Sequence, residues 1–116
     1  MSAKTITITN PDNGNKYELE FNRMEAVKLE KKGISMQKLV EDGKPLTLIW
    51  ELFDASFNMH SARITKNEKQ KLFDLVNNKF VEKLIDMYAD SVNSLLGDEP
   101  KAENENEGNA LWEANW

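Results

Sequence analysis

Residue types that commonly carry catalysis are scarce in this chain. Its 116 residues include a single histidine, His60, and no cysteine, so disulfides, thiol nucleophiles and thiolate metal sites are excluded. No HExxH, Walker-type or dinucleotide-binding glycine pattern occurs. We expect His60 to lie on a helix as an ordinary histidine, in the protein interior or at its rim, rather than to act as a base or a ligand. The sequence therefore predicts a protein that is not an enzyme and that uses no cofactor and no metal.

One pair of carboxylates has a spacing that acid–base or metal chemistry can use. Glu51 and Asp54 are three residues apart, which places both on one face of a helix. No histidine and no further acid shares that face, whereas a calcium ion takes about six to eight oxygen ligands. We therefore expect a solvated polar stripe at this position.

Charge is distributed unevenly along the chain. The formal net charge is −5, and residues 97–116 account for it with six acids and one lysine. Residues 1–96 carry the remaining 14 basic and 14 acidic side chains and are neutral. Because a neutral body offers no basic footprint to a phosphate backbone, we expect no binding of nucleic acid. The first two thirds of the acidic segment, which are rich in asparagine, have the composition of a flexible tether.

The last six residues return large apolar side chains, namely Leu111, Trp112 and Trp116. The two tryptophans are four residues apart, so one helical turn would bring both indoles together. Two arrangements remain open. Either the tail folds back on its own domain or on a neighbouring copy, or these three residues anchor the chain on a different partner.

The elements that would position these groups are organised around residues 46–64. The apolar side chains of this segment cover more than half of the circumference of a helix, so we expect a central helix that is packed from several sides. Trp50, Phe53 and Phe57 lie on this helix. They either belong to the core or line an exposed groove for a partner.

Capping signals mark the starts of further helices. Asn22, Ser35 and Thr65 each precede a helical pattern and can accept a hydrogen bond from one of its first amides. Glu25 and Glu68 follow Asn22 and Thr65 at the spacing of a capping box, in which the glutamate bonds back to the amide of the cap residue. We expect helices over 23–32, over a short segment that stops at Gly43, and from residue 66 onward.

The expected fold class is α+β and mainly α. Residues 4–21 alternate apolar and polar side chains around an Asn- and Gly-rich turn, which predicts a β-hairpin whose apolar face lies on helices. The hairpin and about four to five helices in 22–96 make a single globular domain (residues 1–96), followed by a flexible acidic tail (97–116). The helix that begins at residue 66 either ends at Asn77 or continues, bent, to about residue 96.

No apolar run approaches the ~20 residues that a membrane-spanning helix needs, and the N-terminal segment lacks the apolar core of a signal peptide. We therefore expect a soluble cytoplasmic protein that has no contact with a membrane.

From the first helix onward, the order of elements resembles the tail assembly chaperones of long-tailed bacteriophages and gene-transfer agents. The family has a similar acidic first helix ending in glycine, a short helix, an aliphatic-Trp opening of the next helix and a Thr-initiated helix. The matching segments of this chain are FNRMEAVKLEKKG (21–33), SMQKL (35–39), LTLIWELF (46–53) and ITKNE (64–68). The resemblance covers about residues 21–92.

The resemblance implies a protein that coats the long helical tape measure protein before tail tube subunits polymerise around it. Such a protein is made in the host cytoplasm, contacts the tail tube protein as it is displaced, and is absent from the finished particle. The alternative function is a structural phage adaptor or a self-assembling component that stays in the virion. In that case the C-terminal tail would join copies of the chain into a homo-oligomer.

Overall fold

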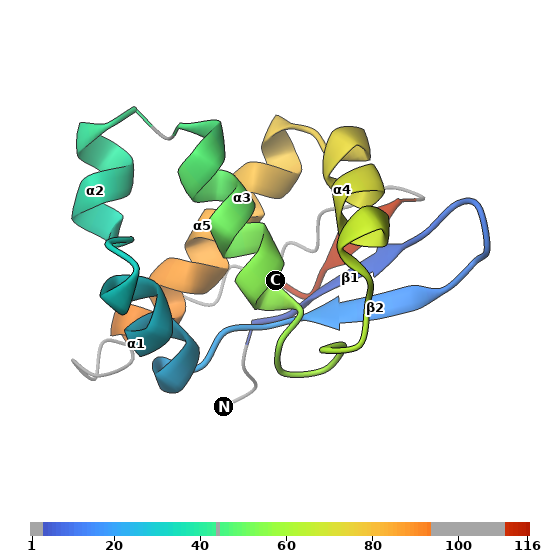
Figure 1. Ribbon diagram of the computed structural model, residues 1–116, viewed down its shortest axis with the longest axis horizontal. Coiled ribbons are helices and arrows are strands. Elements are labelled where there is room, and N and C mark those ends of the chain that lie inside the picture. The colour runs from blue at the N-terminus through green and yellow to red at the C-terminus, as the bar shows by residue number, and fades with distance from the viewer. Residues whose placement is uncertain (1–3, 44, 94–110) are drawn as a thin grey trace.

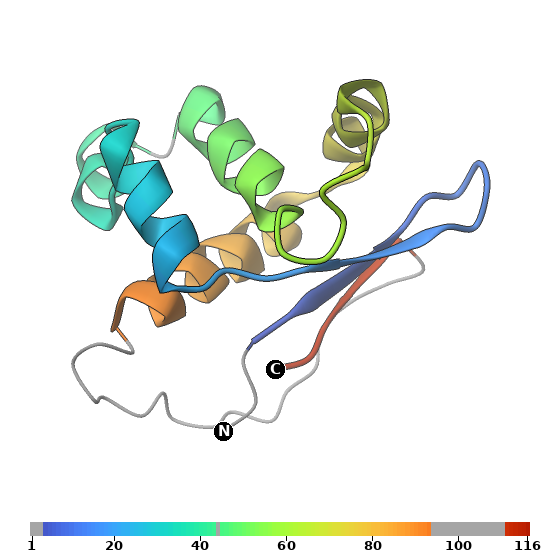
Figure 2. The ribbon, with the colours of Figure 1, turned by 60° about the horizontal axis from the view of Figure 1, so that its bottom comes forward.

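The computed structural model describes residues 4–43, 45–93 and 111–116. Helices cover one face of a three-stranded antiparallel sheet (Figures 1 and 2), which confirms the α+β, mainly α, fold class. Within the described residues, no helix is both long enough and apolar enough to cross a membrane. In chain order the elements are β1 (Ile6–Thr9), β2 (Lys16–Leu19), α1 (Arg23–Lys31), α2 (Met36–Glu41), α3 (Leu46–Ser56), α4 (Lys66–Leu75), α5 (Asn78–Asn93) and β3 (Trp112–Ala114).

The predicted N-terminal hairpin is confirmed. Strands β1 and β2 pair antiparallel, and Gly14 in the turn between them has a φ of 75°, a conformation that glycine adopts without steric cost. Ile6 and Ile8 on β1 and Leu19 on β2 are fully buried. The apolar face of the hairpin therefore lies on the helices, as the alternation of side chains predicts.

Strand β3 is the main departure from the sequence expectation. It pairs antiparallel with β1, so the strand order is β2-β1-β3. Two bonds extend the pairing beyond β3, because the Thr9 amide donates to the Leu111 carbonyl (2.7 Å) and the Asn115 amide donates to the Thr5 carbonyl (3.0 Å). The free edge of β1 offers unpaired backbone groups that an extended segment satisfies.

The helical turn that would bring Trp112 and Trp116 together therefore does not form, because Trp112–Ala114 is a strand. The domain boundary at residue 96 is wrong, because residues 111–116 complete the sheet of the same domain. In an extended chain, residues four apart are separated by about 13 Å, so the two indoles do not meet. The rest of the predicted flexible tail, residues 97–110, lies outside the described residues.

The predicted helix caps are confirmed. The side chains of Asn22, Ser35 and Thr65 each accept a hydrogen bond from the backbone amide three residues later, at 2.9, 3.1 and 3.1 Å. Asn77 caps a further helix by accepting from the Phe80 amide (3.0 Å). Of the two possibilities for the region after residue 66, the structure therefore has two separate helices, α4 and α5.

The central helix is shorter than expected, because α3 ends at Ser56 rather than near residue 64. The Ser56 carbonyl accepts a hydrogen bond from the Glu20 amide of the hairpin (3.0 Å), which takes the place of a bond within a further helical turn. The chain then turns through a loop that contains Asn58 and Ser61, which have lower helix propensity than alanine. His60 consequently lies exposed in the loop between α3 and α4, which corrects its expected place on a helix.

The core is centred on the rings of α3. Phe53 contacts the rings of Phe57, Phe73 and Phe80 at centroid distances of 5.0, 5.3 and 5.7 Å. Helix α5 packs against both α1 and α3. The fully buried Phe53 and Phe57 confirm the core interpretation of these two residues, and Trp50 packs beside them, half-buried.

Candidate functional site

The six side chains that the sequence offers as partner contacts do not form one surface. Phe53, Phe57 and Trp112 are buried in the core, so they face no partner in this arrangement. The other three are half-buried. Trp50 lies on α3, whereas Leu111 and Trp116 flank β3.

Trp116 is held against its own domain. Its ring lies 4.9 Å from the Lys83 ammonium and 5.5 Å from that of Lys4, the geometry of a cation–π contact. Lys83 also donates to a main-chain oxygen of Trp116 (2.8 Å). The described part of the tail thus folds back on the domain that carries it.

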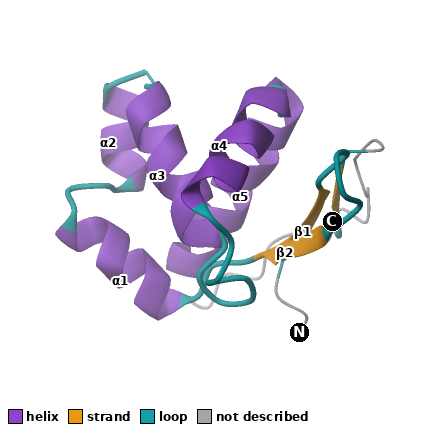
Figure 3. Cartoon of the chain, turned by 45° about the vertical axis from the view of Figure 1, so that its right-hand side comes forward, coloured by secondary structure: helices purple, strands orange, loops and turns teal. Residues whose placement is uncertain are grey.

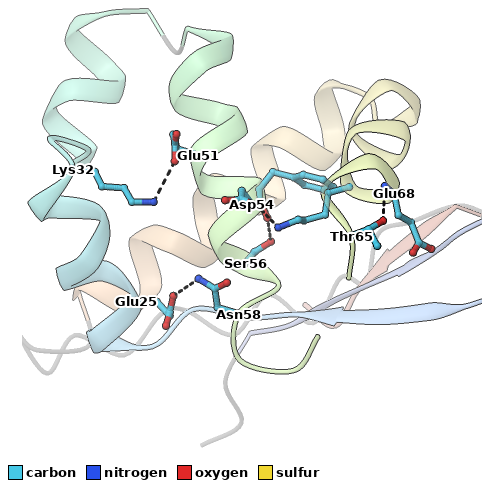
Figure 4. Close-up of polar contacts among 10 residues, drawn as sticks. Glu25, Lys32, Glu51, Asp54, Ser56, Asn58, Thr65 and Glu68 are labelled. Atoms are coloured by element: carbon cyan, nitrogen blue, oxygen red, sulfur yellow. Dashed lines mark hydrogen bonds and ion pairs between the residues drawn. The ribbon is translucent and has the colours of Figure 1, made fainter. Parts of the chain in front are cut away.

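The carboxylates of Glu51 and Asp54 point to different neighbours (Figure 4). Glu51 lies 3.6 Å from the Lys32 ammonium after α1, and Asp54 pairs with Lys69 on α4. Because each carboxylate has its own lysine, the pair does not make a joint acid–base or metal site. Its observed role is to connect α3 to the helices on either side.

The side chains of Glu25 and Glu68 bond to other elements of the fold, and not to the caps of their own helices as the predicted capping boxes require. The Glu25 side chain is buried. Its Oε1 accepts from Asn58 Nδ2 at 2.9 Å (Figure 4), and its Oε2 lies 3.1 Å from Lys28 Nζ. The reciprocal half of the capping box is replaced by a link from α1 to the loop after α3, which keeps a buried carboxylate paired.

Glu68 makes the equivalent link from α4 to the hairpin. Its Oε2 accepts hydrogen bonds from the Tyr17 hydroxyl and from Asn10 Nδ2, both at 2.7 Å. The bond from Tyr17, followed by that from Asn10, holds the pKa of Glu68 below its usual value of 4.5. Burial, followed by the bond to Glu68, raises the pKa of Tyr17 above its usual 10.0.

Acidification is therefore expected to weaken the link between the hairpin and α4. Because the folded-state pKa of Glu68 lies below its unfolded value, the stabilisation is fully present above the unfolded pKa. It is lost as the pH falls through the lowered folded value. The free energy of unfolding in urea, measured from neutral pH down to about pH 3, should show this loss. In Tyr17→Phe the loss should be smaller, because the hydrogen bond from Tyr17 is the largest cause of the lowered pKa of Glu68. Equal pH dependence in the two proteins would contradict the assignment.

A partly open hollow of about 310 Å³ lies between α1 and the end of α3. Three lysines line this hollow, together with apolar and amide groups. The hollow is lined by one carboxylate, one amide and three amines, with no hydroxyl, thiol or imidazole among its lining side chains. It can accept a side chain of a partner, and its lysines can attract carboxylates. The lining residues are Glu25, Lys28, Leu29, Lys31, Lys32, Ala55 and Asn58.

Four exposed apolar side chains lie on the three helices α1, α2 and α3. These helices lie together (Figure 3), and the four are among the large apolar residues that the described part of the chain leaves exposed. We call them the exposed apolar set: Met24, Val27, Val40 and Leu46. Val40 and Leu46, which are 67% and 73% exposed, flank the turn between α2 and α3. Sequence reasoning did not single out these four residues.

A cluster of two glutamates and one histidine was also missed. Glu18 and Glu20 meet His60 at the end of the hairpin. The available signal was the spacing of the glutamates, because residues two apart on a strand share a face. The approach of His60 depends on where α3 ends, which the helical pattern did not reveal.

Comparison with known proteins gives a family but no described activity. Neither the curated proteins nor the solved structures contain a match to this chain. One family model, described as a domain of unknown function (DUF5055), matches residues 1–116. Because the match spans the whole chain, the protein belongs to the DUF5055 family.

Proposed function

We propose that this protein is a tail assembly chaperone of a long-tailed bacteriophage. It binds and solubilises the tape measure protein in the host cytoplasm and gives way to the tail tube protein as the tube assembles. The observation that carries the proposal is the exposed apolar set on α1, α2 and α3. The identity of the partner rests on the resemblance of residues 21–92 to that family.

The exposed apolar set has the chemistry that an amphipathic helix needs. Such a helix binds by laying its apolar face on an apolar surface of its partner. Full burial of an aliphatic side chain of the size of Leu46 or Val40 is worth about 1.5–3 kcal/mol. Two such contacts are enough to change an affinity by several powers of ten.

The hollow beside α1 adds a polar component to this surface. Lys28, Lys31 and Lys32 stand at it and complement acids on the polar side of a bound helix. The acids of residues 97–116 add negative charge, which keeps a complex with an apolar partner in solution.

Co-expression with an apolar helical segment of the tape measure protein tests the proposal. The native chain should raise the soluble fraction of that segment and co-purify with it. The double variant Val40→Asp, Leu46→Asp should bind at least about tenfold more weakly, because each carboxylate must lose its hydration at the contact. Both positions are exposed, so the fold is expected to survive.

Leu75→Asp provides the matched control. Leu75 is also an exposed apolar residue, but it lies on α4, outside the exposed apolar set. This variant should bind as the native chain does. If the native chain leaves the solubility of the segment unchanged, the chaperone role is refuted. Detection of the protein in purified virions would instead support the alternative, a structural component that stays in the particle.

A further inference from the structure

Two elements bring three metal-ligating side chains together on the surface. Glu18 on β2 and Glu20 just after it point to the outward side of the sheet, opposite the buried Leu19. His60 reaches them from the loop after α3, with its Nε2 2.7 Å from Glu20 Oε1 and 3.3 Å from Glu18 Oε2. One potential ligand atom from each of the three residues lies within 4.8 Å of the other two.

The backbone around the cluster is fixed before any ligand binds. The Glu20 amide donates to the Ser56 carbonyl (3.0 Å), which ties the end of β2 to the end of α3. The Ser61 amide donates to the carbonyl of Phe57 (2.8 Å), whose side chain is fully buried. The loop that carries His60 is thus anchored on both sides, and only side-chain rotation is needed to adjust the three ligands.

Within residues 4–43, 45–93 and 111–116, no lysine or arginine forms an ion pair with Glu18 or Glu20. Among the described residues, Glu25, Glu51 and Asp54 each pair with a lysine, whereas the recorded ion pairs of Glu18 and Glu20 are with His60 alone. Lys16 lies on the same face of β2 but forms no ion pair with either glutamate. Two carboxylates therefore converge on an imidazole, an arrangement that a divalent cation stabilises.

We propose that Glu18, Glu20 and His60 form a binding site for a divalent transition-metal ion, with Zn²⁺ as the best fit. Zinc takes histidine nitrogen and carboxylate oxygen at about 2.0–2.2 Å, which requires neighbouring ligand atoms to lie roughly 3–3.5 Å apart in a tetrahedron. The present separations need only small changes to reach this range. Water completes the coordination, and the imidazole favours zinc over Mg²⁺ or Ca²⁺.

Bound zinc would cross-link the end of β2 to the loop between α3 and α4. This contact is separate from the exposed apolar set, so it does not depend on the proposed function. Because the ion binds ligands that are brought together only in the folded chain, it is expected to raise the melting temperature in a concentration-dependent manner.

The single histidine makes a direct test possible. His60 is the only imidazole of the chain, so its side-chain nitrogen signals in an NMR spectrum report on this site alone once any purification tag has been removed. Titration of the full chain with zinc chloride should shift these signals and saturate at one equivalent. Calorimetry should show that Glu18→Gln and Glu20→Gln each weaken binding by more than about tenfold, since even loss of an outer-shell partner costs a metal site about 10–100-fold.

Glu113→Gln is the matched control. Glu113 lies on β3 and pairs with Thr7, the residue that also pairs with Glu18 on the other side, so it is an exposed acid of the same sheet without a nearby histidine. Its variant should bind zinc as the native chain does. The acidic residues in 97–110 are the same in every variant. Any weak binding of zinc by them therefore contributes equally to the native chain and to each variant. If zinc leaves the His60 signals unmoved, or if Glu113→Gln weakens binding as much as Glu20→Gln, the proposed site is refuted.

Discussion

Replacing Trp112 with alanine is expected to lower the free energy of unfolding by about 3–5 kcal/mol, the usual cost of removing a buried tryptophan. The Trp112 side chain is only 3% exposed, and its ring packs against that of Phe80 in a T-shaped arrangement at a centroid distance of 5.5 Å. The substitution leaves a cavity between β3 and α5. Because small domains have only about 5–15 kcal/mol of stability, urea unfolding should show a large shift of the midpoint.

Trp116→Ala is the control for this prediction. The Trp116 ring is half-buried and lies over Lys4 and Lys83, so its loss should cost about 1 kcal/mol or less. Equal effects of the two substitutions would contradict the placement of β3 in the sheet. A chain truncated at residue 96 lacks β3 and should be destabilised at least as much as Trp112→Ala. Loss of partner binding in that truncation would therefore not identify a docking motif.

Phe53→Ala is the second substitution that should endanger folding, again by about 3–5 kcal/mol. Phe53 is fully buried, and its ring contacts the rings of Phe57 just after α3, Phe73 on α4 and Phe80 on α5. The lost ring leaves a void that the surrounding rings cannot fill without leaving their preferred rotamers. Thermal unfolding followed by circular dichroism should show either a strongly lowered melting temperature or no cooperative transition.

Trp50→Ala tests whether this effect comes from burial rather than from aromatic character. Trp50 lies on the same helix and contacts Phe53 and Phe73 at 6.1 and 5.3 Å, but it is only half-buried. Its loss should cost clearly less than that of Phe53, because part of its surface is already in contact with water. A greater loss from Trp50→Ala would mean that the core is not centred on Phe53.

Features that depend on neighbours in the sequence were predictable. The caps at Asn22, Ser35 and Thr65 each involve an amide three residues away, and the hairpin joins strands that are adjacent in the chain. The alternation around Ile6 and Ile8 identified the buried face of the sheet. In each case the residue types and their spacing carry all the information that the local geometry needs.

Features that depend on distant segments were not predictable. Thr5 and Asn115 are 110 residues apart in the chain, yet they hydrogen bond to each other. A strand as short as β3 has no periodicity to reveal it. The spacing of Trp112 and Trp116 fits a helical turn, but it carries no information about β3. This strand forms because β1 has a free edge with which it can pair. Glu25 and Glu68 show the same limit, since their side chains leave the expected local bonds for Asn58 and Tyr17.

The candidate binding surface also depends on the tertiary structure. Val40 and Leu46 belong to helical patterns that predict burial for many apolar residues. The packing of α2 and α3 decides which of these apolar side chains stay exposed. Likewise, His60 meets Glu20 only because α3 ends at Ser56. The function of this surface therefore has to be tested at the residues that the fold leaves exposed.

Photo-cross-linking in phage-infected cells tests the proposed chaperone role at the contact itself. A photoreactive amino acid would replace Leu46 in the exposed apolar set and, in a second protein, Leu75 on α4. The chaperone role predicts that the probe at Leu46 cross-links to the tape measure protein, whereas the probe at Leu75 gives far less of that product. Cross-links from Leu46 only to further copies of the same chain, or equal capture of the tape measure protein from both positions, would contradict it.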